Sequence, residues 1–446
     1  MRMVRGKPLV FFFTVGLVAS ACASTAEIAE VPVDVDVEIP LDFAPETGQD
    51  TATEASTTSA EVTTTAVPED AQAPVEEAVE EVLEVACDAP GAENRVDVQL
   101  SGNRLSSGAL DLANAPSVVD VTLPGPIQWV VPSSEPNEWI AVLTDGQLFR
   151  VSSDSTNIEI TEIDGTWDAL FAPPVVTDDA TLVSPLREHE LFEDPLLDGR
   201  VVRSGSILAV LATPTDRYAH GVLGDAIEAA AIEWVDVCDD TSGRIDIADP
   251  DVIEGVAPIL ADIDDDGDVE ILVTISNSSG GARLSAYKLD GSLLAESAPI
   301  GRGNRWRNQL AVGPFGPAGE TEVLDVQTPH IGGILQAFQL QDGDGGLILE
   351  RVAASDGAFT SHPLGSRNLD MGVAIDANLD GAPDALVATF SRDRLVALTR
   401  TSGGQGWQEV AAVALPGQLT SNIAVTRDDG QASIAAGAGN VLRVWQ

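Results

Sequence analysis

The stretch "LADIDDDGDVEILV", Leu260 to Val273, places five aspartates and one glutamate within nine residues, directly before an apolar run. Carboxylates this close repel each other by ~1 kcal/mol or more per pair even in water, so the charge calls for a neutralising partner. The run that follows, Ile271 to Val273, is rich in β-branched residues and reads as a β-strand. The stretch therefore predicts a charged turn that leads into a buried strand.

The same order of residues returns in "GVAIDANLDGAPDALVATF", Gly372 to Phe390. Two weaker copies, "LAVGPFGPAGETEVLDV" and "NIAVTRDDGQASIAAGA", keep the frame but lose most of the acids. The four turn glycines are Gly267, Gly319, Gly381 and Gly430, at spacings of 52, 62 and 49 residues. A fixed period of this size is the signature of a repeat architecture.

Each repeat carries about four short strand candidates, which is typical of a β-propeller blade. Upstream, residues 127–153 and 201–237 have the pattern of two further blades. We therefore predict an all-β fold, a β-propeller of six or seven four-stranded blades over residues 87–446. The chain ends in "NVLRVWQ", the pattern of a third strand, so we expect residues 94–100, "NRVDVQL", to supply the missing outer strand.

The first 22 residues have basic residues, then an apolar run from Leu9 to Leu17, then small residues before Cys22. This is the pattern of a secretory signal, too short to span a membrane. The cysteine after small residues resembles a bacterial lipobox, so we expect an exported lipoprotein anchored on the extracytoplasmic side through Cys22. The alternative is ordinary cleavage nearby, with Cys22 incidental.

Residues 23–86 are rich in Thr, Glu, Ala, Val and Pro, with Phe43 as the only aromatic residue. Such a composition buries too little apolar surface to fold, so we expect a disordered acidic linker. The whole chain carries 71 acidic against 23 basic residues, a formal charge of −48. This charge disfavours nucleic acid as a partner, because phosphates would be repelled.

Two cysteines remain, Cys87 and Cys238. An exported compartment permits a disulfide between them, which would close a long loop and stabilise the fold. The alternative is two buried thiols.

The acidic turns have the alternating oxygen pattern of a calcium loop, with carboxylates or amides at positions 1, 3, 5 and 9 and glycine at position 6. In the first loop these positions are Asp262, Asp264, Asp266 and Glu270, and in the second they are Asp376, Asn378, Asp380 and Asp384. Neither loop is an EF-hand, because position 12 is Val273 or Val387 and a strand follows.

In these motifs the sequence resembles the FG-GAP and VCBS repeat families, the calcium-loop propellers of integrin α subunits and many exported bacterial proteins. The resemblance implies one Ca²⁺ in each loop, held by the side chains named above and by a backbone carbonyl near Asp268 or Ala382. Its role would be structural, because exported loops of this kind bind at about 10⁻⁴ to 10⁻³ M. The alternative is an acidic hairpin solvated by water.

Strand order predicts that the acidic loops share one face of the propeller, and that three of the four histidines and the densest basic cluster lie on the opposite face. The candidate ligand residues there are His220, Arg302, Arg305, Trp306, Arg307, His330, His362 and Arg367. Arginines could clamp an anionic or sugar-like ligand while Trp306 offers a stacking surface. The alternative is that the arginines neutralise neighbouring carboxylates and the histidines cap turns.

Three function classes follow from these features. A binding or protein-interaction module, with an envelope protein or an anionic or carbohydrate ligand as partner, fits best. A polysaccharide lyase or hydrolase that uses the His and Arg face is the enzyme alternative, but no nucleophile elbow, zinc-protease helix, phosphate loop or dinucleotide fingerprint occurs. A plain scaffold is the third class, since fold alone does not decide function.

Overall fold

The computed structural model describes residues 102–153, 158–168, 172–176, 182–184, 187–218, 220–403 and 406–446. The chain divides into two units, Met1–Glu69 and Asp70–Gln446, and every described residue belongs to the second unit. The signal, the linker and Cys87 lie outside the described residues.

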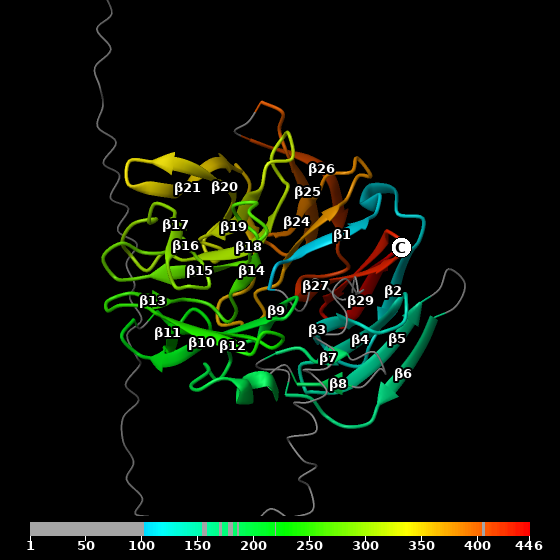
Figure 1. The fold of residues 1–446 in the computed structure, drawn as a ribbon. Coiled ribbons are helices and arrows are strands. Elements are labelled where there is room, and N and C mark those ends of the chain that lie inside the picture. Colours follow the sequence, from blue (N-terminus) through cyan, green and yellow to red (C-terminus); the bar gives the residue numbers. More distant parts are fainter. Residues whose placement is uncertain are drawn as a thin grey trace, which may run out of the picture. The chain divides into compact units, whose positions relative to one another are not determined.

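The described residues form six four-stranded antiparallel blades, which confirms the β-propeller (Figure 1). Blade 1 consists of β3 (Ile127–Pro132), β4 (Glu138–Leu143), β5 (Leu148–Ser153) and β6 (Ile158–Ile163). Blade 2 consists of β9 (Val202–Ser204), β10 (Ile207–Thr215), β11 (Glu228–Asp236) and β12 (Thr241–Asp246). Blade 3 consists of β14 (Ile259–Ala261), β15 (Glu270–Ser276), β16 (Arg283–Tyr287) and β17 (Leu293–Glu296).

The remaining three blades follow in chain order. Blade 4 consists of β18 (Arg307–Gly313), β19 (Glu322–Gln327), β20 (Ile334–Gly343) and β21 (Gly346–Ala354). Blade 5 consists of β23 (Gly372–Asp376), β24 (Asp384–Thr389), β25 (Arg394–Arg400) and β26 (Trp407–Ala414). Blade 6 consists of β27 (Leu419–Asp428), β28 (Gln431–Ala438), β29 (Val441–Trp445) and β2 (Val118–Thr122).

Short elements connect or cover the blades. They are β1 (Leu105–Ala109), η2 (Leu112–Asn114), β7 (Val175–Val176), β8 (Leu182–Val183), η3 (Arg187–Leu191), β13 (Val252–Ile253) and β22 (Phe359–Thr360). Strand β13 joins blades 2 and 3 into a nine-stranded sheet, and β1 joins blades 5 and 6 into a ten-stranded sheet that also includes β22. First strands of neighbouring blades contact one another in the pairs β9–β14, β14–β18, β18–β23, β23–β27 and β27–β3, while β7 contacts β3 on the side toward blade 2. The helices in the described part of the chain are all too short or too polar to span a membrane.

As predicted, a strand from the N-terminal part of the chain supplies the outer strand of blade 6, but that strand is β2 and not residues 94–100. Strand β2 pairs antiparallel with β29, from Val118 opposite Trp445 to Thr122 opposite Val441. Residues 94–100, the predicted closing strand, lie outside the described residues. The two segments have the same alternating valine pattern, and only pairing in three dimensions distinguishes them.

The N-terminal strand β1 contacts the first strands of blades 4, 5 and 6 and runs outward between blades 5 and 6, where it also pairs with β28 (Figure 1). It pairs in parallel with β23, and the backbone of Arg104 bonds to both Leu310 O, at 3.2 Å, and Ala374 N, at 2.7 Å. Gly102 precedes it at φ +69°, where a Cβ atom would lie 2.1 Å from the carbonyl oxygen of Pro258. Only glycine fits this approach.

Second strands are buried on both faces because each blade is packed between two others. In β15, Ile271 and Val273 belong to a core shared with blade 2, while Leu272 belongs to a core shared with blade 4. Alternate side chains of a strand point to opposite faces, so a continuous apolar run serves two cores at once. Each fully buried side chain of this size contributes roughly 1.5–3 kcal/mol.

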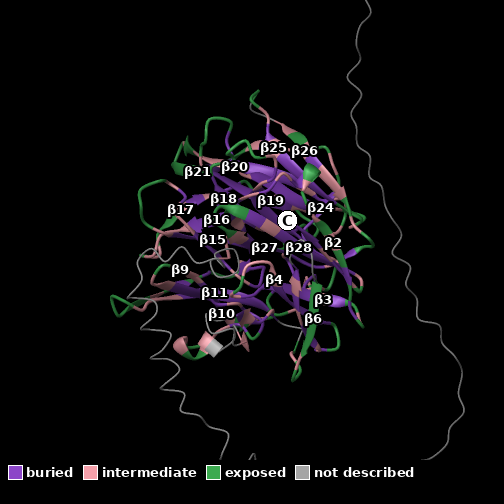
Figure 2. Ribbon diagram, turned by 90° about the vertical axis from the view of Figure 1, so that its right-hand side faces the viewer, coloured by how far each residue is buried: buried purple, intermediate pink, exposed green. Residues whose placement is uncertain are grey.

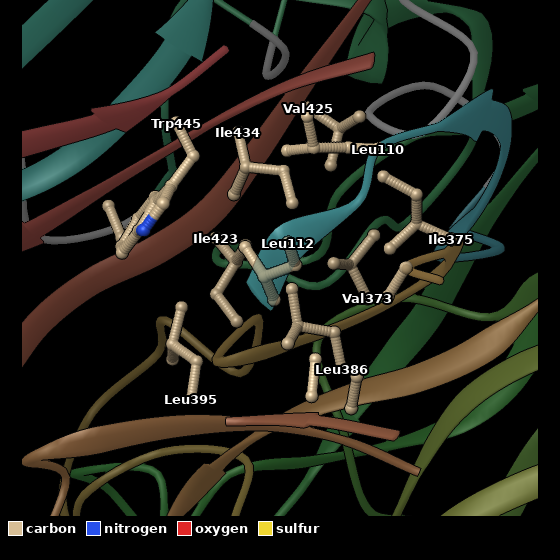
Figure 3. Packing of buried hydrophobic residues seen from close by; sticks show 14 of the residues in the cluster. Leu110, Leu112, Val373, Ile375, Leu386, Leu395, Ile423, Val425, Ile434 and Trp445 are labelled. Atoms are coloured by element: carbon tan, nitrogen blue, oxygen red, sulfur yellow. The ribbon is translucent and has the colours of Figure 1, made fainter. Parts of the chain in front are cut away.

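The core between blades 5 and 6 takes in the segment that follows β1. Leu110 and Leu112 pack there among Val373, Ile423 and Ile434 (Figure 3). Exposed residues gather in loops and on outer strands such as β6 (Figure 2). The N-terminal segment is therefore part of the propeller's interior.

Candidate metal loops and the opposite face

The two acidic loops connect the first and second strands of blades 3 and 5, as predicted. Gly267 and Gly381 have φ values of +92° and +88°. Two residues before each glycine, Asp265 and Leu379 also have positive φ, at +58° and +63°. The weaker copies place Gly319 and Gly430 in the matching loops of blades 4 and 6, at +85° and +83°. A turn with this backbone requires glycine at position 6.

The position 1 carboxylates make the same hydrogen bonds in both loops. Asp262 accepts from Asp266 N at 3.1 Å and from Gly267 N at 2.9 Å. Asp376 accepts at the same distances from Asp380 N and Gly381 N. These bonds fix the same turn in both loops.

The position 9 carboxylates are fully buried and only half satisfied. One oxygen of Glu270 accepts from Ile263 N at 2.8 Å, and one oxygen of Asp384 accepts from Ala377 N at 3.0 Å. Their other oxygens, Glu270 Oε1 and Asp384 Oδ1, have no hydrogen-bond partner among the described residues. Burial raises the pKa of both groups, to about 6 for Asp384. Buried polar atoms normally have partners, so these two oxygens are free to accept one that the described residues do not supply.

A lysine side chain from the neighbouring strand reaches the first loop, a contact that the sequence did not predict. Lys288 Nζ lies 2.8 Å from Asp266, 3.0 Å from Asp264 and 3.6 Å from Glu270. Hydrogen bonds to Asp266 and then Asp264 raise the pKa of Lys288. The sequence held one sign of this contact. Lys288 is one of only two lysines, and it directly follows Tyr287, which pairs with Ile271 next to Glu270.

The donor set fits a hard cation. One carboxylate oxygen from each of Asp262, Asp264 and Glu270 lies within 4.8 Å of the others. The second loop offers Asp376, Asn378 and Asp384 at the same positions. At position 7, Asp268 N and Ala382 N donate to the position 5 carboxylates at 2.9 Å, and a ligand role for their carbonyls stays a prediction. All of these ligands are oxygens, as Ca²⁺ prefers.

On the opposite face, the structure brings three histidines together around Trp306. The ring nitrogens His330 Nε2 and His362 Nε2 are 2.8 Å apart, and Trp306 packs against both rings. His220 bonds to the buried carboxylate of Glu254, whose backbone oxygen accepts from Trp306 Nε1 at 3.1 Å. Burial lowers the pKa of His330 to about 4 and that of His362 as well, so both rings are neutral at physiological pH.

The contacts correct the ligand prediction for three residues. Trp306 is only 2% exposed and cannot stack on a ligand from solution. Arg307 is buried with Asp325, 3.4 Å from its carboxylate, and Arg367 forms ion pairs with Asp198, at 2.6 Å, and with a neighbouring aspartate. These two arginines neutralise carboxylates, which was the alternative interpretation. Arg302 and Arg305 are exposed.

Exposed aliphatic side chains on this face were also missed. Leu197, Ile331 and Leu364 are 73%, 75% and 69% exposed. Each of these residues is next in sequence to a residue that contacts another loop. Asp198 forms an ion pair with Arg367, His330 contacts His362, and Gly365 N donates to Val222 O. Single exposed leucines are common, so no pattern in the sequence marks these three.

Cys238 is disulfide-bonded. Cys87 and Cys22 lie outside the described residues, so the pairing of Cys238 with Cys87 and the lipidation of Cys22 stay predictions.

No protein-family model matches the chain, and no curated protein matches it. Among solved structures, the WD40 β-propeller domain of Doa1 is 10% identical, with a TM-score of 0.41, over 74% of this chain and 96% of that one. The β-propeller domain of Myceliophteria thermophila Cps50 (Swd1) is 12% identical, also with a TM-score of 0.41, over 73% of this chain and 99% of that one. The fold assignment rests on the sheet topology described above.

Proposed function

We propose that this chain is an exported, lipid-anchored β-propeller of the FG-GAP and VCBS type that is stabilised by calcium and binds a protein partner. The observation that carries the calcium part is the repeated loop. Two segments 114 residues apart in sequence fold into the same turn, and each ends on a buried carboxylate with one unpartnered oxygen. A bound Ca²⁺ would satisfy these oxygens and offset the repulsion among the acids.

The composition of the opposite face supports a protein partner. Its connected loops expose Leu197, Ile331 and Leu364, and the exposed Arg302 and Arg305 lie in the loop that leads into blade 4. Aliphatic side chains rimmed by arginine are typical of protein interfaces. Trp306, the ring predicted to stack on a sugar, is buried, which removes the main support for a carbohydrate ligand.

The geometry favours binding over catalysis. A lyase or hydrolase would need a histidine and an arginine that reach an open site. His362 is fully buried against His330, and Arg367 is held by two aspartates.

A site-specific photo-crosslinker tests the partner face in the cells that make the protein. Placed at Ile331 or Leu364, it should give one discrete adduct, which excess unlabelled chain competes away and an Ile331→Asp/Leu364→Asp chain does not. The matched control is Leu347, an exposed aliphatic residue in β21. Equal adducts from Leu347, or none from either test position, would refute the assigned face.

A further inference from the structure

The two acidic loops have the same backbone but different third strands. Ile271, which follows position 9 of the first loop, pairs with Tyr287 on β16. Ala385, which follows position 9 of the second loop, pairs with Leu398 on β25. The next residues, Lys288 and Thr399, therefore take the same place beside their loops.

Lys288 brings a positive charge to that place. Its Nζ atom lies within 3.6 Å of the carboxylates at positions 3, 5 and 9 of the first loop, the groups that would ligate a metal. The ammonium group donates to Asp264 Oδ2 and Asp266 Oδ2, and its charge beside the remaining oxygens of Asp264 and Glu270 would repel a divalent cation.

Thr399 brings no charge. Its neutral hydroxyl is no counter-charge for Asp384, which is completely buried and whose Oδ1 has no hydrogen-bond partner among the described residues. The first loop also keeps such oxygens, Asp264 Oδ1 and Glu270 Oε1, but Lys288 Nζ lies 3.6 Å from Glu270. Among the described residues, Asp384 has no ion pair, so the two loops differ in the positive charge that Lys288 supplies.

We infer that Lys288 serves as a built-in cation of the first loop, so that the chain binds calcium at the second loop alone. The inference rests on the proposed calcium function and assigns it to one of two similar sites. Blade 3 is then stable without metal, and blade 5 depends on it.

A residue swap between the loops tests this assignment. Equilibrium dialysis of the full chain against radioactive CaCl₂, in a background of about 150 mM NaCl to screen diffuse binding, counts the bound ions. We expect one Ca²⁺ per wild-type chain, two for Lys288→Thr, and at least a tenfold loss of affinity for Thr399→Lys. Circular dichroism checks that each variant folds.

A matched pair at position 5 gives an independent readout. Asp380→Asn should abolish most binding in the wild-type background, whereas Asp266→Asn should leave it unchanged. Two equivalent sites in the wild type that Lys288→Thr does not alter would overturn the inference while sparing the calcium function. No bound calcium in any chain would overturn both.

Discussion

Glu228, at the start of β11, is a carboxyl group that the fold keeps away from water. It is buried, and burial together with the charges of Glu254, Asp198 and Asp225 raises its pKa to about 10. An unfolded glutamate titrates near 4.3. The folded chain therefore holds a proton that the unfolded chain releases, so the free energy of unfolding falls as the pH rises above about 4.3.

Glu228→Gln should remove this dependence, because glutamine does not ionise. The variant should match the wild type near pH 4 and become more stable than it by up to about 1.4 kcal/mol for each pH unit above that. Urea unfolding at about pH 4.5, 6 and 7.5 measures the difference. Parallel curves for the two chains would show that Glu228 is ionised in the folded state.

At the scale of single residues, the sequence predicted the geometry of the acidic loops better than the contacts of the opposite face. Asp262 and Asp376 lie where the alternating pattern placed them, because a ligand loop is local and its spacing is written in consecutive residues. Trp306 and Arg307 depend on which residues from other blades pack over them. Lys288 likewise reaches the first loop from a neighbouring strand, so no local motif includes it.

Among the elements, second strands are the easiest to predict. The run "EILVTIS" of β15 is buried throughout, and the sequence indicated a strand from its composition alone. Strand β2 carries an alternating pattern with a single buried side chain, Val121. Nothing local distinguishes it from other valine-rich segments, and its pairing with β29 connects residues more than 300 positions apart.

Strand β2 should tolerate charge on one face and not on the other. Val121→Asp would place a carboxylate in the core that Val121 shares with Ile127 and Leu442, and we expect a loss of at least about 3 kcal/mol. Val118→Asp, on the exposed side of the same strand, should change stability by about 0.5 kcal/mol or less. Chemical denaturation compares the two, and equal losses would mean that β2 does not close the ring.

At the scale of the whole molecule, Arg104 forms hydrogen bonds to the first strands of three blades. Its guanidinium group donates to Ile423 O at 2.7 Å and Gly372 O at 3.3 Å, and lies 3.7 Å from Asp370. These bonds join first-strand residues of blades 5 and 6, while the Arg104 backbone bonds to blade 4. Because Arg104 is buried, removing its guanidinium group would leave these carbonyl oxygens without a donor and away from water.

Arg104→Met should therefore destabilise the entire propeller in one cooperative transition, by about 3 kcal/mol or more. The exposed Arg302→Met is the control and should have little effect. Unfolding followed by tryptophan fluorescence and by circular dichroism should shift together. A shift in only one probe would mean that the blades near Arg104 unfold separately.

The central claim is that calcium bound in the second acidic loop stabilises the propeller, and thermal melting of the full chain tests it most directly. Raising Ca²⁺ from about 10 µM to 10 mM should increase Tm by a few degrees, as expected for sites of about 10⁻⁴ to 10⁻³ M. Mg²⁺ at equal concentration controls for screening of the −48 charge and should do less. Asp384→Asn should remove the calcium-specific rise. An equal rise with Mg²⁺, an undiminished rise in Asp384→Asn, or no rise at all would contradict the account.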